Sequence, residues 1–367
     1  MKVHLIKGGD YMAISSVMQI EIDSNRNGRT YRVYRFSEFN VELDLTTDAD
    51  IFDFVLKNPK GIYSGLFSKF DNCRLKVNGK VVMKGNLDKV EYIDRDDDDY
   101  IQLSGRDLCW KLIDNDALPD TKENVNPKTY IQKKCKEYGI PCKVSSADKY
   151  DKLVIGCGES EISIFNNILL ESKQRVWFLI DTLYTGDWSM GKSPSHVFVM
   201  HTSETGIPIK SFRLVEDGTD MKSEMKVYGS DSKSGYNLVG SSTNNYMKKI
   251  GITKRQTRRA YSENASSKYK SIADKDIREN FRDNNELVIE VRLDKNNIYL
   301  PNTTAQVING RCGVNALFFI KRVAYRKTIS DGSMAELTMI PADTTFEKIW
   351  QTKGTSCTNL TKASKAL

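Results

Sequence analysis

The sequence predicts an α+β protein that is mainly β, with two antiparallel β-barrels and a small α/β module inserted between them. The first hundred residues alternate apolar and polar positions in short runs between turn residues, a helical period replaces this pattern after Gly105, and β-type runs return from about Lys210. We expect the following domains: a first barrel over 1–105, the inserted module over 106–209, a second barrel with one helix over 210–345, and a C-terminal tail over 346–367.

The composition is that of a folded chain. Of the 367 residues, 39% are hydrophobic and 28% are charged, unlike the low-hydrophobicity composition of disordered chains. The net charge of +7 is modest for this length and does not by itself indicate a nucleic-acid partner. The apolar character of the N-terminus ends within a few residues, so we expect no signal peptide. No run of about 18 apolar residues is present, so we expect no membrane insertion.

The cysteine pattern indicates a reducing environment. The seven cysteines are odd in number and form no C-x-x-C pair. They are Cys73, Cys109, Cys135, Cys142, Cys157, Cys312 and Cys357. We therefore expect synthesis in a reducing cytosol, with thiols that serve as small apolar residues.

The sequence of the first barrel predicts a hairpin with a specific turn type. Asn78-Gly79 suits a type I′ turn, because both central residues of that turn need φ > 0. One strand should therefore end near Val77 and the next should begin near Lys80. A further hairpin should follow, with the acidic run DRDDDD at its tip.

Two acidic turns resemble parts of calcium sites. The loop 94–99 (DRDDDD) has neither a Gly hinge nor a distal Glu, so we interpret it as a solvated hairpin end. The turn from Asp23 to Gly28 has the D-x-N-x-N-G spacing that opens an EF-hand loop. Its twelfth position is Tyr34, where a bidentate Glu is needed, and its flanks are strands. We expect a metal at neither turn.

The inserted module should contain three helices. The first spans about 106–114, the second begins at Pro127 and ends before Gly139, and the third lies within 158–172 and precedes a buried strand. The apolar positions at helical spacing are Leu108, Leu112, Ile113, Tyr130, Ile131, Cys135, Tyr138, Ile164, Phe165, Ile168 and Leu169. Three aromatic residues are expected to fill the same core rather than to bind a ligand, namely Trp110, Trp177 and Phe178.

The closing run of the chain repeats the order of the opening stretch. After β-type runs in FRLVEDG, SEMKVYGSD and ELVIEVRL and one helix over 267–284, the chain has an apolar strand, a Val-x-Tyr strand, a polar loop tip and a closing strand. Val323 and Tyr325 correspond in this order to Val90 and Tyr92. The repeated pattern predicts two related barrels. Three subunits with two such barrels each could close a three-fold ring with a pseudo-six-fold inner layer.

Four segments in a fixed order carry a family resemblance. They are the hairpin KVVMKGNLDKVEY leading to IQLSGRDL, the module segment GESEISIFNNILLES, the run SEMKVYGSD before a basic stretch and a helix, and the ending IKRVAYRKTISDGSMAELTMIPAD. Over nearly the whole chain, this order resembles the baseplate hub proteins of Mu-like contractile phage tails. That group includes the hubs of phage-tail-like bacteriocins, and it resembles the N-terminal part of type VI secretion spike proteins.

The resemblance implies two tail-tube-like β-barrels and a homotrimeric ring between the hexameric tail tube and the trimeric central spike. Such a hub seats the spike, gives the tube a platform for polymerisation and leaves a channel for DNA once the spike is released. The implied partners are the tail tube protein, the central spike protein and baseplate wedge proteins, with DNA only in transit. The implied location is the baseplate of a virion tail assembled in the host cytoplasm. No enzymatic step is implied, and we predict no catalytic, cofactor-binding or metal-ligating residues.

A peptidoglycan-degrading tail-associated hydrolase is one alternative. His4, His196 and His201 are the only histidines, and the sequence contains neither H-E-x-x-H nor G-x-S-x-G. In HVFVMH, the spacing places the last two histidines on opposite faces of a strand, which argues against a shared metal. A triad drawn from distant segments stays open as an alternative.

Three glutamates flank the third predicted helix of the module, namely Glu159, Glu161 and Glu171. Because carboxylates stabilise the positive end of the helix dipole, we expect Glu159 and Glu161 to act there rather than in acid catalysis.

A nucleic-acid-binding module is the other alternative. Its candidate residues, within or beside the basic stretch 248–270, are Lys248, Lys249, Lys254, Arg255, Arg258, Arg259, Lys268 and Lys270, with Tyr246, Tyr261 and Tyr269 interleaved. Such residues can neutralise phosphates and stack on bases. A mobile loop, or a subunit interface that meets acidic partners, explains the same composition and is the interpretation we favour.

Overall fold

The structure is a computed structural model of the chain. It describes residues 17–342 apart from short gaps at 59–60, 95–98, 170–171, 173, 189, 191–192, 232–234, 260–265 and 329–331. The predicted tail 346–367 lies outside the described residues.

The described residues form two compact units. Unit 1 comes from Met1–Ser189, Arg292–Asn302 and Lys321–Leu337, and unit 2 comes from Met190–Val291, Thr303–Ile320 and Thr338–Leu367. The boundary between the units falls within two long strands, β20 (Val314–Thr328) and β21 (Gly332–Pro341). Each unit therefore contains part of both strands.

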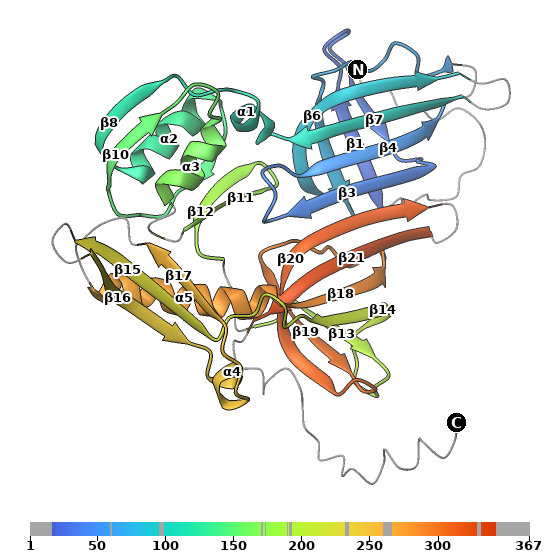
Figure 1. Cartoon of the computed structure of the whole chain (residues 1–367). Coiled ribbons are helices and arrows are strands. Elements are labelled where there is room, and N and C mark those ends of the chain that lie inside the picture. The colour runs from blue at the N-terminus through green and yellow to red at the C-terminus, as the bar shows by residue number, and fades with distance from the viewer. Residues whose placement is uncertain are drawn as a thin grey trace. The chain divides into compact units, whose positions relative to one another are not determined.

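Unit 1 contains an antiparallel sheet with strand order β20-β3-β4-β7-β6-β5-β1-β2 (Figure 1). Besides β20, its strands are β1 (Met18–Asp23), β2 (Thr30–Val33), β3 (Glu38–Asp44), β4 (Ile51–Lys57), β5 (Asn72–Val77), β6 (Lys80–Ile93) and β7 (Tyr100–Asp107). Burial alternates along these strands, so that Val41, Leu43, Phe52 and Phe54 are buried while their neighbours are not. This is the period of two expected for strands with one buried face.

The turn at Asn78-Gly79 has the conformation that its sequence predicts. The φ angle is +51° at Asn78 and +78° at Gly79, as a type I′ turn requires. Strand β5 ends at Val77 and β6 begins at Lys80, so both predicted bounds are confirmed.

Gly105 lies inside a strand rather than at the end of the β-rich region. Strand β7 continues to Asp107, and an added Cβ at Gly105 would lie 2.1 Å from the Asn86 carbonyl oxygen and 2.4 Å from Cζ of Phe52. Glycine therefore permits a close approach between β6, β7 and the Phe52 ring. The first predicted helix is correspondingly shorter than expected, since α1 spans only Trp110–Ile113.

The α/β module follows β7 within unit 1. Its other elements are β8 (Asp120–Val125), α2 (Pro127–Glu137), β9 (Cys142–Lys143), β10 (Tyr150–Ile155), α3 (Glu161–Leu169), β11 (Arg175–Leu179) and β12 (Thr182–Gly186). They form the sheets β10-β8 and β11-β12-β9. One apolar cluster, which includes buried side chains of α2 and α3, fills the module.

The two longer helices of the module begin and end where their sequences predict. Asn126 caps α2, since its Oδ1 accepts a hydrogen bond from the Thr129 amide, and Pro127 occupies the first turn. Gly139 follows the helix with φ +67°, as expected for a residue just beyond a helix end. In α3, the four predicted inward residues, Ile164, Phe165, Ile168 and Leu169, are all buried.

The three aromatic residues predicted for the module core lie in different environments. Phe178 belongs to the apolar cluster, as predicted. Trp177 is buried but stacks on Tyr184 beside a pocket. The prediction for Trp110 is wrong, because this residue is not part of the apolar cluster of the module. It begins α1, a single turn that closely follows β7. The Trp110 indole packs near Phe70, with ring centroids 6.1 Å apart, and donates its N–H to Asn86 Oδ1 at 3.0 Å.

Six strands, most of them from unit 2, close into a barrel. The strand order is β19-β13-β14-β18-β21-β20, and β19 also pairs with β20. Its remaining strands are β13 (His196–Met200), β14 (Ile207–Glu216), β18 (Asn285–Arg292) and β19 (Thr303–Asn309). Strand β13 and the first three residues of β14 come from within 106–209, so the barrel takes residues from the range expected for the module.

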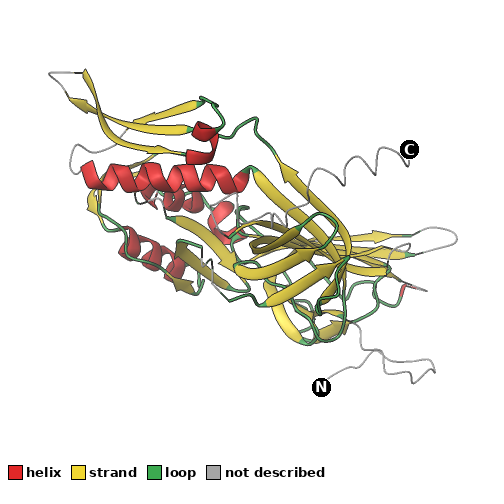
Figure 2. Ribbon diagram, turned by 90° about the horizontal axis from the view of Figure 1, so that it is seen from below, coloured by secondary structure: helices red, strands yellow, loops and turns green. Residues whose placement is uncertain are grey.

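Unit 2 also contains a separate three-stranded sheet. Its elements are β15 (Glu224–Asp231), β16 (Gly235–Thr243), α4 (Asn245–Lys249), β17 (Arg255–Arg259) and α5 (Ser266–Asp283). The strand order is β16-β15-β17, and α5 packs on this sheet through Tyr269, Ala273 and Ile277. Strands predominate over helices in the described residues (Figure 2), so the predicted mainly-β fold class is confirmed.

Candidate functional site

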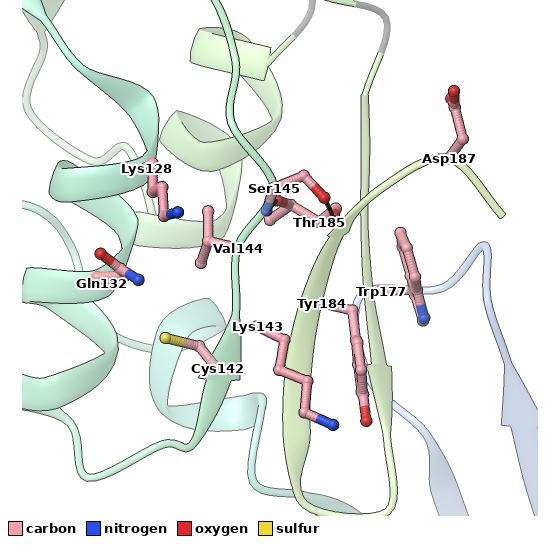
Figure 3. A pocket seen from close by; sticks show the side chains of 10 residues that line it. All are labelled: Lys128, Gln132, Cys142, Lys143, Val144, Ser145, Trp177, Tyr184, Thr185 and Asp187. Carbon is pink, nitrogen blue, oxygen red and sulfur yellow. Dashed lines mark hydrogen bonds between the residues drawn. The ribbon is translucent and has the colours of Figure 1, made fainter. Parts of the chain in front are cut away.

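The α/β module has a polar pocket of about 480 Å³ between α2, β9, β11 and β12 (Figure 3). Its lining residues are Lys128, Gln132, Cys142, Lys143, Val144, Ser145, Trp177, Tyr184, Thr185 and Asp187. Its walls come from segments far apart in the sequence.

Strand pairing places three of the lining side chains in a row. Lys143 lies opposite Tyr184 in the parallel pair of β9 and β12, and Trp177 lies opposite Tyr184 in the antiparallel pair of β11 and β12. The Trp177 and Tyr184 rings stack with centroids 5.7 Å apart, and Lys143 Nζ lies 5.3 Å from the Tyr184 ring centroid. The Tyr184 ring is thus sandwiched between an indole and an ammonium group (Figure 3).

Two hydrogen bonds fix the wall beyond β9. The Ser145 amide donates to Thr185 Oγ1 at 3.0 Å, and Ser145 Oγ donates to the Thr185 carbonyl at 2.8 Å. Because both groups of Ser145 are engaged with β12, its hydroxyl is not poised as a nucleophile.

The lining residues provide positive charge and hydrogen-bonding groups but no histidine. Lys128 and Lys143 are its cations, Asp187 is its single carboxylate, and Cys142 is its one thiol. This composition suits contacts with polar groups better than covalent catalysis, which needs a base beside the nucleophile.

The sequence did not single out this row of residues as a site. Because side chains alternate between the two faces of a strand, RVWFL and TLYTG could have been used to place Trp177 and Tyr184 each on one face of its strand. No local signal could have paired β9 with β12, because 38 residues lie between Lys143 and Thr182.

His196 is the first residue of β13 and His201 follows that strand, while His4 lies outside the described residues. His196 Nδ1 lies 2.9 Å from Ser195 Oγ and its ring stacks near Phe198, while burial lowers its pKa. His201 follows β13 with φ +52° and is exposed. Within the described ranges, no three His, Cys, Asp or Glu side chains gather in a way that could hold a metal ion.

Glu161 is a buried structural carboxylate. It lies in the first turn of α3, and its Oε1 is 2.7 Å from Lys134 Nζ. Desolvation opposes charge on Lys134, yet the hydrogen bond and charge of Glu161 raise the pKa of Lys134 above its usual range. Glu159 Oε2 accepts from the Gly156 amide at 2.8 Å. Glu171 lies outside the described residues.

In the described part of the basic stretch, several cations pair with other segments of unit 2. Strand β17 runs parallel to β15, and Arg255 Nε lies 2.7 Å from Glu224 Oε2. Arg258 Nη1 lies 3.6 Å from Asp276 Oδ2, and Lys254 Nζ donates to the carbonyls of Gly218 and Thr219. The mobile-loop interpretation is therefore wrong for 255–259.

One of the three tyrosines in the nucleic-acid hypothesis is not available for stacking on bases. Tyr269 is buried in the apolar cluster under α5 and cannot stack on a base. Tyr246 is partly exposed on α4, and Tyr261 lies outside the described residues. Lys248 and Lys249 at the end of α4 are exposed, as are Lys254, Arg255, Arg259 and Lys270.

The two acidic turns make protein contacts or lie at a gap. Asp23 forms an ion pair with Arg74, with Oδ2 and Nη1 2.8 Å apart, and Thr30 donates to its Oδ1. The hairpin of β6 and β7 encloses 94–99 as predicted, but 95–98 lie outside the described residues.

None of the helices in the described ranges is both long and apolar enough to cross a membrane.

No protein-family model and no curated protein matches this sequence. Solved structures do match. A tail protein from Neisseria meningitidis is similar with a TM-score of 0.72 and 18% identity, over 91% of this chain and 99% of that chain. The 43 kDa tail protein of prophage MuSo2 from Shewanella oneidensis has a TM-score of 0.70 and 14% identity, over 89% of this chain and 98% of that chain.

A more distant match comes from a secretion system. The E. coli c3393 protein has a TM-score of 0.53 and 10% identity, over 83% of this chain and 73% of that chain. It is described as a component of the type VI secretion system with structural similarity to the T4 bacteriophage tail proteins gp27 and gp5. Over most of its length, the present chain therefore has the fold of phage tail proteins.

Proposed function

We propose that the chain is a structural baseplate hub of a contractile phage tail or tail-like particle. It forms a homotrimeric ring that joins the hexameric tail tube to the trimeric central spike and leaves a channel for DNA. The observation that supports this proposal is the extent of the fold similarity, since about nine-tenths of this chain and nearly the whole of two tail proteins superpose. A match over the full length argues for a shared architecture rather than one shared domain.

The strand edges support an assembled state. In the described part of unit 1, the strand order ends at β2. An edge strand is a liability in a free monomer, and proteins cover or block such edges. In a ring, neighbouring subunits and the tail tube cover them. The tube protein, the spike protein and wedge proteins are the partners in this function, and no catalytic step is part of it.

The end of α4 is a candidate contact surface in the ring. Lys248 and Lys249 are exposed, and Ile250 beside them is 53% exposed. Arg255 and Arg258 are unsuitable for testing this contact, because their ion pairs stabilise unit 2 itself. Charge reversal at Lys248 and Lys249 tests the interface without breaking those pairs.

The test is negative-stain electron microscopy of the purified full chain, alone and mixed with its spike protein, classified without imposed symmetry. We expect three-fold rings with an open centre. Monomers under both conditions would contradict the proposal.

A matched pair of variants sharpens this test. K248E/K249E should reduce the fraction of rings, while K133E/K136E, which reverses two exposed lysines of α2, should leave it unchanged. Equal ring fractions in both variants would show that α4 is not a subunit contact.

A further inference from the structure

Two cysteines of the α/β module, Cys135 and Cys142, are seven positions apart in the sequence and pack in or against one apolar cluster. Cys135 is on the last turn of α2 and is fully buried, whereas Cys142 begins β9, is partly buried and lines the pocket. Cys135 belongs to the apolar cluster of the module and Cys142 packs against that cluster, and Cys142 is near enough to help raise the pKa of Cys135.

The backbone holds this pair in place. The Ile140 amide donates to the Cys135 carbonyl at 2.8 Å, so the chain turns back onto α2 directly before Cys142. The Leu183 amide donates to the Pro141 carbonyl at 2.9 Å, and Leu183 lies opposite Cys142 in the parallel pair of β9 and β12. The Cys142 sulfur points toward α2 (Figure 3). Both sides of the pair are therefore anchored to regular structure.

We infer that Cys135 and Cys142 are a thiol modification site, which a small disulfide oxidant such as oxidised glutathione converts into an intramolecular disulfide. The open pocket gives the oxidant access to Cys142, while Cys135 is reached only through Cys142. One thiol is thus the entry point and the other is the resolving group, as in other thiol–disulfide exchange pairs.

The reaction proceeds in two exchange steps. The Cys142 thiolate attacks oxidised glutathione, forms a mixed disulfide and releases one glutathione thiolate. The Cys135 thiolate then attacks the Cys142 sulfur and releases the second glutathione. In total, the two protein thiols lose two electrons and two protons, and one oxidised glutathione becomes two reduced glutathiones.

The second step depends on a buried thiol. Burial, reinforced by the neighbouring Cys142, raises the pKa of Cys135 above the usual range of a thiol. Because the thiolate is the nucleophile, resolution of the mixed disulfide becomes faster as the pH rises. The pair stays reduced in a compartment where glutathione is mainly in its thiol form and oxidises where the disulfide form is in excess.

The disulfide would close a loop of eight residues and fasten the end of α2 to β9. If the proposed function is correct, the hub folds in the cytosol and then works in a particle outside the cell, where the bond would form. This consequence rests on the proposed function, whereas the chemistry can be tested on the purified chain in any assembly state.

The test is incubation of the reduced full chain with excess oxidised glutathione, followed by acid quenching, alkylation and peptide mass spectrometry. We expect a linked pair of peptides that contain Cys135 and Cys142, with the mass of two hydrogens lost. The exposed Cys157 and Cys312 should carry glutathione and thus report that the oxidant was active. Free Cys135 and Cys142 beside modified Cys157 would overturn the inference, and so would a link from Cys135 to the buried Cys109.

Two single variants separate the roles. C135S should trap glutathione on Cys142 in nearly every chain, because the resolving thiol is gone. C142S should leave Cys135 reduced, with at least a tenfold loss of its modification relative to the wild type. Modification of Cys135 at the wild-type rate in C142S would contradict the order of the two steps. Both substitutions exchange sulfur for oxygen, and circular dichroism of each variant checks that it is folded.

Discussion

Two strands carry the same Val-x-Tyr pattern and place its tyrosine in opposite environments. Tyr92 of β6 is 42% exposed, whereas Tyr325 of β20 is fully buried. The Tyr92 hydroxyl donates to the Phe67 carbonyl at 3.2 Å. The Tyr325 hydroxyl donates to the Tyr299 carbonyl and accepts from the Tyr299 amide at 3.0 Å.

The difference comes from the neighbours of each strand. Residues 89–93 of β6 pair with β7, but β5 pairs only with the first half of β6, up to Asn86. In β20, residues 322–327 pair with β3 on one side, and β21 is the next strand on the other side. A register shift between Leu87 and Lys89 further alters the alternation in β6. A shared pattern thus identifies two strands, while their neighbours decide which tyrosine is buried.

The largest expected effect is truncation of the buried tyrosine. Tyr325→Ala should lower the free energy of unfolding by about 3–5 kcal/mol, because a fully buried ring leaves a cavity. Tyr92→Ala should cost only about 1 kcal/mol, because much of its ring is already in water. Chemical denaturation followed by tyrosine and tryptophan fluorescence measures both. Equal losses in the two variants would refute the explanation from neighbouring strands.

Close packing within the β6–β7 hairpin gives the next effect. Gly105→Ala should destabilise unit 1 by about 1–3 kcal/mol, since the new methyl group would overlap the Asn86 carbonyl and the Phe52 ring. Gly79→Ala is the matched control. Its Cβ would meet no atom within 4 Å, so only the positive φ costs energy, about 1 kcal/mol. Thermal unfolding midpoints should therefore fall further for Gly105→Ala, and the reverse order would contradict the close approach.

The base of the same hairpin should make stability depend on pH. Asp107 at the end of β7 accepts from the Asp50 amide and from the Cys109 amide. Burial raises the pKa of Asp107 to about 7, and burial and the Asp107 charge raise the pKa of Asp50 well above its usual range. Protonation is therefore favoured in the folded state.

The sign of the effect follows from that shift. The stabilising contribution of the protonated carboxyl is fully present below the unfolded pKa of about 4, and it is lost as pH rises through about 7. Between those values we expect the free energy of unfolding to fall as the pH rises. Asp107→Asn should reduce this dependence, as measured by denaturation at several pH values. An identical slope in wild type and variant would exclude Asp107 as the titrating group.

Removal of a single hydroxyl gives the smallest effect. Tyr325→Phe should cost about 1–2 kcal/mol, because it leaves the buried Tyr299 carbonyl and amide without their hydroxyl partner. Tyr92→Phe should cost about 0.5 kcal/mol, since water can replace a hydroxyl at an exposed site. Hydrogen exchange of the Tyr299 amide provides a local readout. Unchanged protection of that amide in Tyr325→Phe would show that the hydroxyl bond is not needed.

Local sequence determined much of this protein. The φ requirements of Asn78-Gly79, the cap and stop of α2 and the apolar face of α3 depend on residues within a few positions of one another. For that reason the hairpin, the two helices and the mainly-β class could all be predicted from the sequence.

The tertiary structure decided the rest. Several features depend on segments that are distant in the chain. They are the parallel pairs β9–β12 and β15–β17, the place of β13 in the barrel, and the burial of Tyr325. The pocket and the proximity of Cys135 and Cys142 depend on such pairings and on the turn that precedes β9. Sequence periodicity gives the face of a strand but not its neighbour, because many pairings bury the same apolar face and only the packed fold selects one of them.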